Sequence, residues 1–210
     1  MWTNCRLLLF TRYPEAGKTK TRLITELGAT GAALLQKRLT ERIAHQAKLL
    51  AQRTGIASDV HFAGGSRKKM TFWLGAMNCV EQTNGDLGQR MRSAFEHSIE
   101  AGAETVVLTG SDIPDISAEL LQQAFTSLLT KQVVIGPSQD GGYYLIGMVA
   151  SQAPKLYPLL FEEMPWSTGE LFATTVSRLE KAGYDVAILP TLRDIDLPAD
   201  LPFAKKRGLL

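Results

Sequence analysis

Short apolar runs alternate with longer amphipathic segments along this chain. The runs are rich in Leu, Val and Ile, which is typical of strands buried on both faces of a sheet. They predict strands at residues 5–10, 59–63, 78–83, 105–109, 132–136, 143–148 and 185–189. This alternation predicts an α/β protein in three layers, an α/β/α sandwich in which helices cover both faces of a mostly parallel sheet.

The amphipathic segments predict the helices between these strands. Apolar residues recur every three or four positions in residues 31–53, 87–99, 117–129 and 168–183, as on the buried side of a helix. In the first of these segments, Gln36 is expected on the solvent-facing side. Ser167 and Glu170 have the spacing of a capping box at the start of the last segment. The polar residues 64–69 are expected to form a solvated loop.

Composition narrows the class of protein. A length of 210 residues favours one domain, expected to span residues 1–210. The net charge of +2 is too small for bulk attraction to nucleic acid or to an anionic membrane. Cys5 and Cys79 lie in apolar runs without metal-ligand spacing, which favours a reduced, cytoplasmic protein with neither zinc nor a disulfide. The first apolar run, residues 7–10, is too short for a signal peptide or a membrane span.

Charged side chains follow several of the predicted strands. Asp112 comes directly after the strand at 105–109, where an open parallel sheet keeps its ligands. Carboxylates also follow later strands, at Asp140, Asp194 and Asp196, and the cations Lys18, Lys20 and Arg22 follow the first strand. Phosphate oxygens need such cations, and a divalent metal that bridges phosphates needs such carboxylates. The pattern is therefore typical of a nucleotide site; alternatively, Asp112 and Asp115 are turn and cap residues.

Two common phosphate-binding patterns are excluded. The triplet Gly17-Lys18-Thr19 resembles the end of a P-loop, but Arg12 stands where that pattern needs its first glycine. The dinucleotide pattern GxGxxG does not follow the first strand.

Six ordered motifs resemble those of the DUF2064 family. They are residues 10–23 (FTRYPEAGKTKTRL), 85–91 (GDLGQRM), 110–115 (GSDIPD), 136–147 (GPSQDGGYYLIG), 166–168 (WST) and 194–198 (DIDLP). That family is similar to nucleotide-diphospho-sugar transferases of GT-A fold, including the molybdenum-cofactor and phospholactate guanylyltransferases. The resemblance implies a GT-A fold and a transferase, but leaves the substrate open.

The resemblance also implies roles for individual residues. Lys18, Lys20 and Arg22 would contact the nucleotide phosphates, with Ser111 beside them, and Gly85 and Asp86 would lie near the base or ribose. Asp112 and Asp196 would hold Mg²⁺ or Mn²⁺. Asp140, Gly141 and Gly142 would form the acceptor side, with Lys20, Arg22 and Asp140 taking part in catalysis. Glu15 departs from the expected phosphate loop by placing an acid in it.

The predicted function is a metal-dependent transferase that takes a nucleoside triphosphate or a nucleotide sugar as donor and a small molecule as acceptor. Both nucleotidyl and glycosyl transfer stay open. The cationic loop after the first strand suits a pyrophosphate leaving group, which favours nucleotidyl transfer. The alternative is a non-catalytic nucleotide-binding or regulatory module of the same fold.

Overall fold

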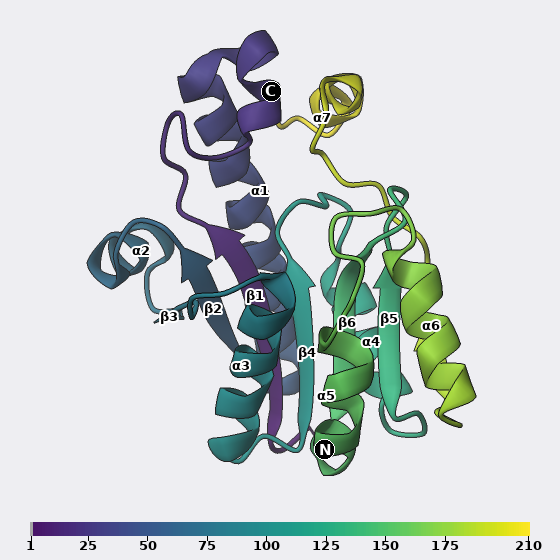
Figure 1. The fold of residues 1–210 in the computed structure, drawn as a ribbon. Coiled ribbons are helices and arrows are strands. Elements are labelled where there is room, and N and C mark those ends of the chain that lie inside the picture. The colour runs from purple at the N-terminus through teal and green to yellow at the C-terminus, as the bar shows by residue number, and fades with distance from the viewer. Residues whose placement is uncertain (1) are drawn as a thin grey trace.

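Seven strands form one sheet in the computed structural model, which describes residues 2–210 (Figure 1). The strands are β1 Cys5–Arg12, β2 Ala57–Ala63, β3 Asn78–Glu81, β4 Thr105–Gly110, β5 Val133–Pro137, β6 Tyr143–Val149 and β7 Val186–Ile188. Their order across the sheet is β3-β2-β1-β4-β6-β5-β7. β6 pairs antiparallel with β4 and β5, and the other pairs are parallel. The carboxyl ends of all strands except β6 therefore meet at one edge, called here the carboxyl edge.

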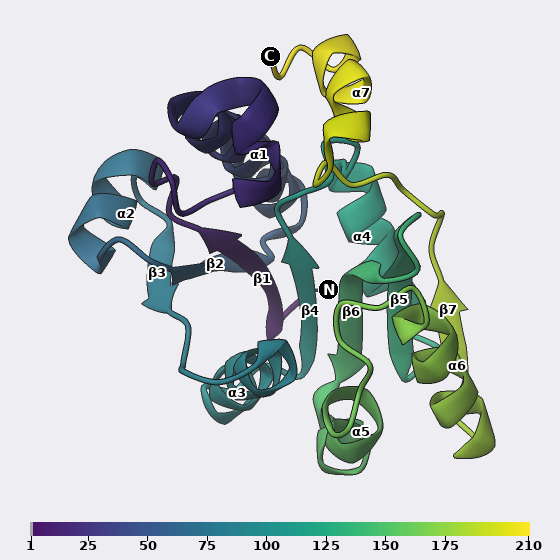
Figure 2. The same ribbon diagram turned by 45° about the horizontal axis from the view of Figure 1, so that its top comes forward.

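Helices cover both faces of the sheet (Figure 2). They are α1 Ile24–Thr54, α2 Arg67–Leu74, α3 Leu87–Glu100, α4 Ala118–Ser127, α5 Ala153–Phe161, α6 Leu171–Lys181 and α7 Leu201–Lys206, with short 3-10 turns at Thr21–Leu23, Ala150–Gln152 and Pro198–Asp200. Alternate residues of a strand point to opposite faces. Leu7 and Leu9 accordingly pack in the core under α1, α2 and α4, whereas Leu8 and Phe10 pack in the core under α3, α5 and α6. The predicted α/β/α sandwich is confirmed.

A third cluster attaches the C-terminal segment to the beginning of α1. Leu35 and Leu39 of α1 pack against Ile195, Ala204 and Leu209, and Figures 1 and 2 both show α7 beside this end of α1. The segment after β7 therefore crosses the carboxyl edge. It is held against the end of β4 by a hydrogen bond from the Ile195 amide to the Asp112 carbonyl, at 3.0 Å.

The predicted strands are confirmed, but the structure corrects several local predictions. Residues 67–69 belong to α2 rather than to a loop, because the Ser66 hydroxyl caps this helix by accepting a hydrogen bond from the Lys69 amide. The capping box at Ser167 is wrong: α6 begins at Leu171, and Ser167 has a left-handed backbone with φ 63°. Leu129, predicted on a buried face, is 70% exposed because α4 ends two residues before it.

Helix α5 was not predicted from the sequence. It contains Pro154 in its first turn and Pro158 inside, and prolines argue against a helix in a pattern analysis. Within residues 2–210, none of the helices has both the length and the apolar character needed to cross a membrane.

Candidate functional site

A cavity of about 630 Å³ opens at the carboxyl edge of the sheet. We call it the main cavity. The ends of β1 and β4, the loop between β1 and α1, the beginning of α3 and the loop before α6 all contribute to its walls. Clefts at this edge are where open α/β sheets bind their ligands, and the volume lies within the range of small-molecule sites.

The loop between β1 and α1 brings the cations to this cavity. Its bend is held by the buried Thr19, whose hydroxyl donates to the Glu15 carbonyl at 3.1 Å. Gly17 has φ 80°, a left-handed conformation that glycine adopts at little cost. Lys20 has the same handedness, with φ 47° and ψ 43°, although it is not glycine. The loop therefore turns sharply just before α1 and directs the Lys20 side chain inward.

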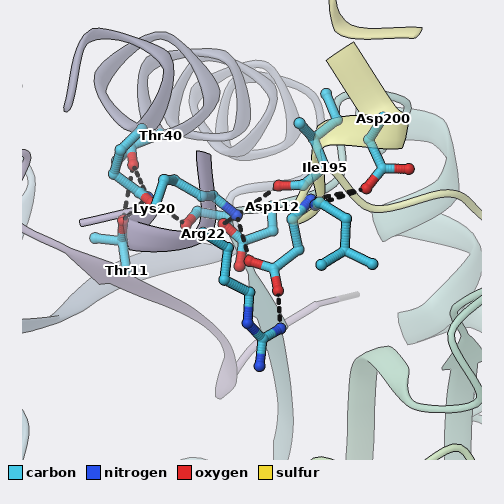
Figure 3. Close-up of polar contacts among 11 residues, drawn as sticks. Thr11, Lys20, Arg22, Thr40, Asp112, Ile195 and Asp200 are labelled. Atoms are coloured by element: carbon cyan, nitrogen blue, oxygen red, sulfur yellow. Dashed lines mark hydrogen bonds and ion pairs between the residues drawn. The ribbon is translucent and has the colours of Figure 1, made fainter. Parts of the chain in front are cut away.

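Lys20 joins the two aspartates that the sequence suggested as metal ligands. Its ammonium lies 2.8 Å from Asp112 Oδ1 and 3.6 Å from Asp196 Oδ1. It also donates to the Ile195 carbonyl at 2.6 Å, as Figure 3 shows for the labelled Lys20, Asp112 and Ile195. Arg22 forms a second ion pair with Asp196. The structure thus brings together four predicted site residues from three distant segments.

The Asp196 side of this cluster is held in place by Asp200. One carboxylate oxygen of Asp200 accepts hydrogen bonds from the backbone amides of Asp196 and Leu197, at 3.1 and 2.8 Å. The other oxygen binds the Arg193 guanidinium through Nε and Nη2. Burial acts to raise the pKa of Asp200, but these amide and guanidinium donors outweigh it and lower the pKa below its ordinary value. The sequence analysis did not predict a role for Asp200. The available signal was its place two residues after Pro198, which is typical of an aspartate in a turn.

Beneath the cluster lies a buried polar network. The Gln36 amide donates to the hydroxyls of Thr40 and Ser111, at 3.2 and 3.1 Å, and the Thr40 hydroxyl shares a hydrogen bond of 2.7 Å with Thr11. Gln36 is only 4% exposed, so its predicted place on the solvent side of the helix is wrong. The network ties α1 to the ends of β1 and β4, and it explains why a polar residue interrupts the buried side of α1.

The opposite side of the main cavity is formed by α3 and the residue after β3. Gln82 donates its amide to the His61 carbonyl at 2.9 Å and accepts from Arg90 Nη1 at 2.9 Å, and both side chains line the cavity. Gly85 and Asp86, predicted near the base or ribose, do not line it. Asp86 instead caps α3 by accepting from the Gln89 amide at 2.8 Å.

Aromatic residues close the third side. Tyr143, Tyr144 and Trp166 line the cavity, and the rings of Tyr143 and Trp166 meet edge to face with centroids 6.5 Å apart. Burial raises the pKa of both tyrosines far above the ordinary value, so both stay neutral. Trp166 packs directly against Gly88 of α3: a Cβ on Gly88 would lie 2.7 Å from the indole ring. Trp73 does not line the cavity and packs against Tyr13.

A second, smaller cavity of about 410 Å³ adjoins the first and shares Arg22 and Asp196 with it. We call it the acidic cavity, because Asp140, Asp194 and Asp200 also line it. Burial and the nearby Asp140 raise the pKa of Asp194. The Asp140 carboxylate accepts a hydrogen bond from the Gly142 amide at 3.0 Å and shapes the β5–β6 turn. Gly141 packs against Gly169 in the loop before α6.

The remaining predicted residues also lie at the main cavity. Ser111 is buried and contributes to its floor. Lys18 lines the rim, but its side chain is 69% exposed and pairs with Glu15 at 2.9 Å. The hydrogen bond from Lys18 lowers the pKa of Glu15. The negative charge that Glu15 adds to the phosphate loop is therefore balanced by Lys18.

The profile of the DUF2064 family, described as an uncharacterized protein conserved in bacteria, matches residues 39–168 of the chain. The chain belongs to the DUF2064 family. A crystal structure from Desulfovibrio desulfuricans G20, provisionally named a nucleotide-diphospho-sugar transferase, is 32% identical and superposes with a TM-score of 0.83. The match covers 92% of this chain and 83% of that one. No curated protein matches the chain.

More distant structures share the fold of this DUF2064 protein. A CMP:2-keto-3-deoxy-manno-octonic acid synthetase complexed with CTP has 14% identity and a TM-score of 0.57, over 98% of this chain and 97% of that one. Rv0371c of Mycobacterium tuberculosis H37Rv, in complex with manganese, has 14% identity and a TM-score of 0.55, over 96% and 97% of the two chains. These likenesses confirm the predicted nucleotide-diphospho-sugar transferase (GT-A) fold.

Proposed function

We propose that this DUF2064 protein is a metal-dependent transferase that uses a nucleoside triphosphate and transfers its nucleotidyl group to a small-molecule acceptor. The observation that carries this proposal is the convergence of Lys20, Arg22, Asp112 and Asp196 on one point of the main cavity. Phosphates need such cations, and a phosphate-bound metal needs such carboxylates.

The residues fit a divalent metal that is shared with the ligand. Among residues 2–210, no group of three or more His, Cys, Asp or Glu side chains is arranged to hold a metal by itself. Asp112 and Asp196 nevertheless direct oxygen atoms at the same ammonium group. Mg²⁺ commonly takes one or two carboxylates and completes its shell with water and phosphate oxygens. When bound, the metal would neutralise phosphate charge and act as a Lewis acid.

The remaining chemistry falls to the protein's own side chains. Lys20 and Arg22 would bind the β- and γ-phosphates and stabilise the charge that develops on leaving pyrophosphate. Lys18 and Ser111 would make further phosphate contacts. The nucleoside would extend toward α3, with Gly85 and Asp86 shaping that end through the cap of the helix.

The acceptor would approach from the acidic cavity. This cavity meets the main cavity at Arg22 and Asp196, next to the phosphate position. Asp140, with Gly141 and Gly142 holding its turn, would orient a hydroxyl of the acceptor. Two adjoining cavities that share one wall suit a reaction in which two substrates must be brought into line.

The names of similar proteins support this assignment. The D. desulfuricans protein is provisionally named a nucleotide-diphospho-sugar transferase, the structure of the octonic acid synthetase is a complex with CTP, and the crystal structure of Rv0371c is a complex with manganese. A nucleotide-sugar donor and glycosyl transfer form the second candidate reaction, since the cavity of about 630 Å³ also has room for a sugar.

The released product distinguishes these reactions. The protein would be incubated with each nucleoside triphosphate or nucleotide sugar and Mg²⁺, with water as a slow acceptor, and the products followed by ³¹P NMR. We expect metal-dependent release of pyrophosphate that is lost in Asp112→Asn. Release of a nucleoside diphosphate from a nucleotide sugar would establish glycosyl transfer instead. Nucleotide binding without any turnover, unchanged in Asp112→Asn, would indicate a non-catalytic module.

A further inference from the structure

Lys20 is the most enclosed member of the charged cluster. Its side chain is 3% exposed, whereas the side chains of Asp112 and Asp196 are 49% and 37% exposed. The ammonium therefore lies on the inner side of both carboxylates, where it forms an ion pair with Asp112 and donates a hydrogen bond to the Ile195 carbonyl. A buried ammonium is costly unless such partners surround it.

The backbone at Lys20 shows that this position is enforced by the fold. A left-handed conformation costs a non-glycine residue about 1 kcal/mol or more. Lys20 adopts it with φ 47°, and its carbonyl accepts from the Leu23 amide at 2.9 Å at the beginning of the 3-10 turn. The loop thus fixes the Cα atom while the flexible side chain carries the charge to the two carboxylates.

An ammonium and a divalent metal compete for the same oxygen atoms. A metal bound to a carboxylate oxygen lies about 2.0–2.1 Å from it, while Lys20 Nζ already lies 2.8 Å from Asp112 Oδ1. A divalent cation held by Asp112 and Asp196 would therefore take the place of Nζ between them. Since the displaced ammonium would keep only the Ile195 carbonyl, it needs new acceptors, which phosphate oxygens supply.

We propose that Lys20 occupies the metal position in the free protein and leaves it only when a phosphate-bearing ligand provides other acceptors. This inference rests on the proposed function for the identity of the ligand. Lys20 is then a positioning residue as well as a phosphate contact: it keeps the two carboxylates together and prevents the metal from binding alone. Nucleotide and metal consequently bind together, and each raises the affinity of the other.

The test is a titration with Mn²⁺ alone, in which the free ion is measured by electron paramagnetic resonance. Lys20→Met removes the ammonium and keeps the unbranched stem. We expect this variant to bind Mn²⁺ roughly tenfold or more tightly than the wild type, since one competing charge contact is gone. Lys20→Arg retains a cation at this position and is expected to bind Mn²⁺ as weakly as the wild type.

The matched control is Lys18→Met, which removes the same charge from the same loop. Lys18 pairs with Glu15 rather than with the two aspartates, so this variant is expected to change the affinity for Mn²⁺ little. Equal gains in Lys18→Met and Lys20→Met, or no gain in Lys20→Met, would overturn the inference. Circular dichroism and thermal unfolding verify that each variant is folded.

The double variant Lys20→Met/Asp112→Asn locates the bound ion. We expect it to lose the gain in Mn²⁺ affinity; a retained gain would place the ion elsewhere and overturn the inference. These experiments also distinguish a failure of this inference from a failure of the proposed function. If no nucleotide binds to the wild type, the proposed function is wrong, while titration with Mn²⁺ alone still decides the role of Lys20.

Discussion

Gly88 allows the first turn of α3 to approach the loop that closes the main cavity. An alanine Cβ at this position would lie 2.7 Å from the Trp166 ring and 2.8 Å from the Phe161 carbonyl oxygen. Both distances are far shorter than ordinary van der Waals contact, and one of them is to backbone. In Gly88→Ala, either the indole or the beginning of α3 must therefore move.

Two effects of opposite sign decide the stability of Gly88→Ala. Alanine favours a helix over glycine by at most about 1 kcal/mol, and less in the first turn. An extra methyl group forced into a well-packed contact lowers the free energy of unfolding by about 1–3 kcal/mol. Because the contact to the Phe161 carbonyl cannot be relieved by a side-chain rotation, we expect the second effect to prevail and the free energy of unfolding to fall by about 1–2 kcal/mol.

Urea unfolding at neutral pH measures this difference by linear extrapolation. Trp166 lines the main cavity, so Gly88→Ala should also weaken the stabilisation given by a bound nucleotide. In a Trp166→Ala background the indole is absent, and the substitution should cost less. A Gly88→Ala variant as stable as the wild type or more stable would refute the packing argument, and an equal cost in both backgrounds would refute the role of the indole.

Two further predictions concern a buried histidine and the support of the Asp196 loop. Burial lowers the pKa of His61 from 6.5 to about 4. The unfolded chain therefore takes up a proton at this histidine at a higher pH than the folded protein does. The contribution of His61 to the free energy of unfolding is fully present above pH 6.5, and about 3 kcal/mol of it is lost as the pH drops from 6.5 to 4. The difference in unfolding free energy between the wild type and His61→Phe should follow this slope. The control is His45→Gln, at an exposed histidine that does not act on His61, and it should leave the slope unchanged. A pH-independent difference would contradict the assignment. Asp200→Ala leaves the Asp196 and Leu197 amides without their acceptor and removes the carboxylate that pairs with Arg193. We therefore expect a loss of about 1–3 kcal/mol in urea unfolding and weaker Mn²⁺-dependent nucleotide binding. Unchanged binding would show that Asp200 does not support the metal position.

Much of the fold could be predicted from the sequence, because its strands are short apolar runs at the centre of a sheet. Leu7 to Leu9 are almost wholly buried, and alternate between the two cores as expected. The antiparallel β6 could not be predicted from its composition, since a strand buried on both faces has the same residues in either direction. Helix α5 was missed because Pro158 opposes a helix locally, while burial of Leu156 and Leu160 favours it.

For the site, the sequence identified the charged residues but not their arrangement. The sequence predicts Lys20 as a phosphate contact and Asp196 as a metal ligand. It does not show that the two side chains form an ion pair, because they meet only when the C-terminal segment packs against α1. Gln36 was expected to face solvent because it lies with the polar residues of an amphipathic segment. Its partners, Thr11 in β1 and Ser111 just after β4, become neighbours only after folding.

The central claim is that Asp112 and Asp196 bind a metal together with the phosphates of a nucleotide. It is tested most directly by thermal unfolding with each nucleoside triphosphate and each common nucleotide sugar, with and without Mg²⁺ or Mn²⁺, in the wild type and in Asp112→Asn. A ligand at about a hundred times its dissociation constant stabilises the folded state by about 2.7 kcal/mol. We predict that at least one nucleotide stabilises the wild type only when metal is present, and that this effect is lost in Asp112→Asn. Stabilisation that is independent of metal and unchanged in the variant, or no stabilisation by any nucleotide, would contradict the claim.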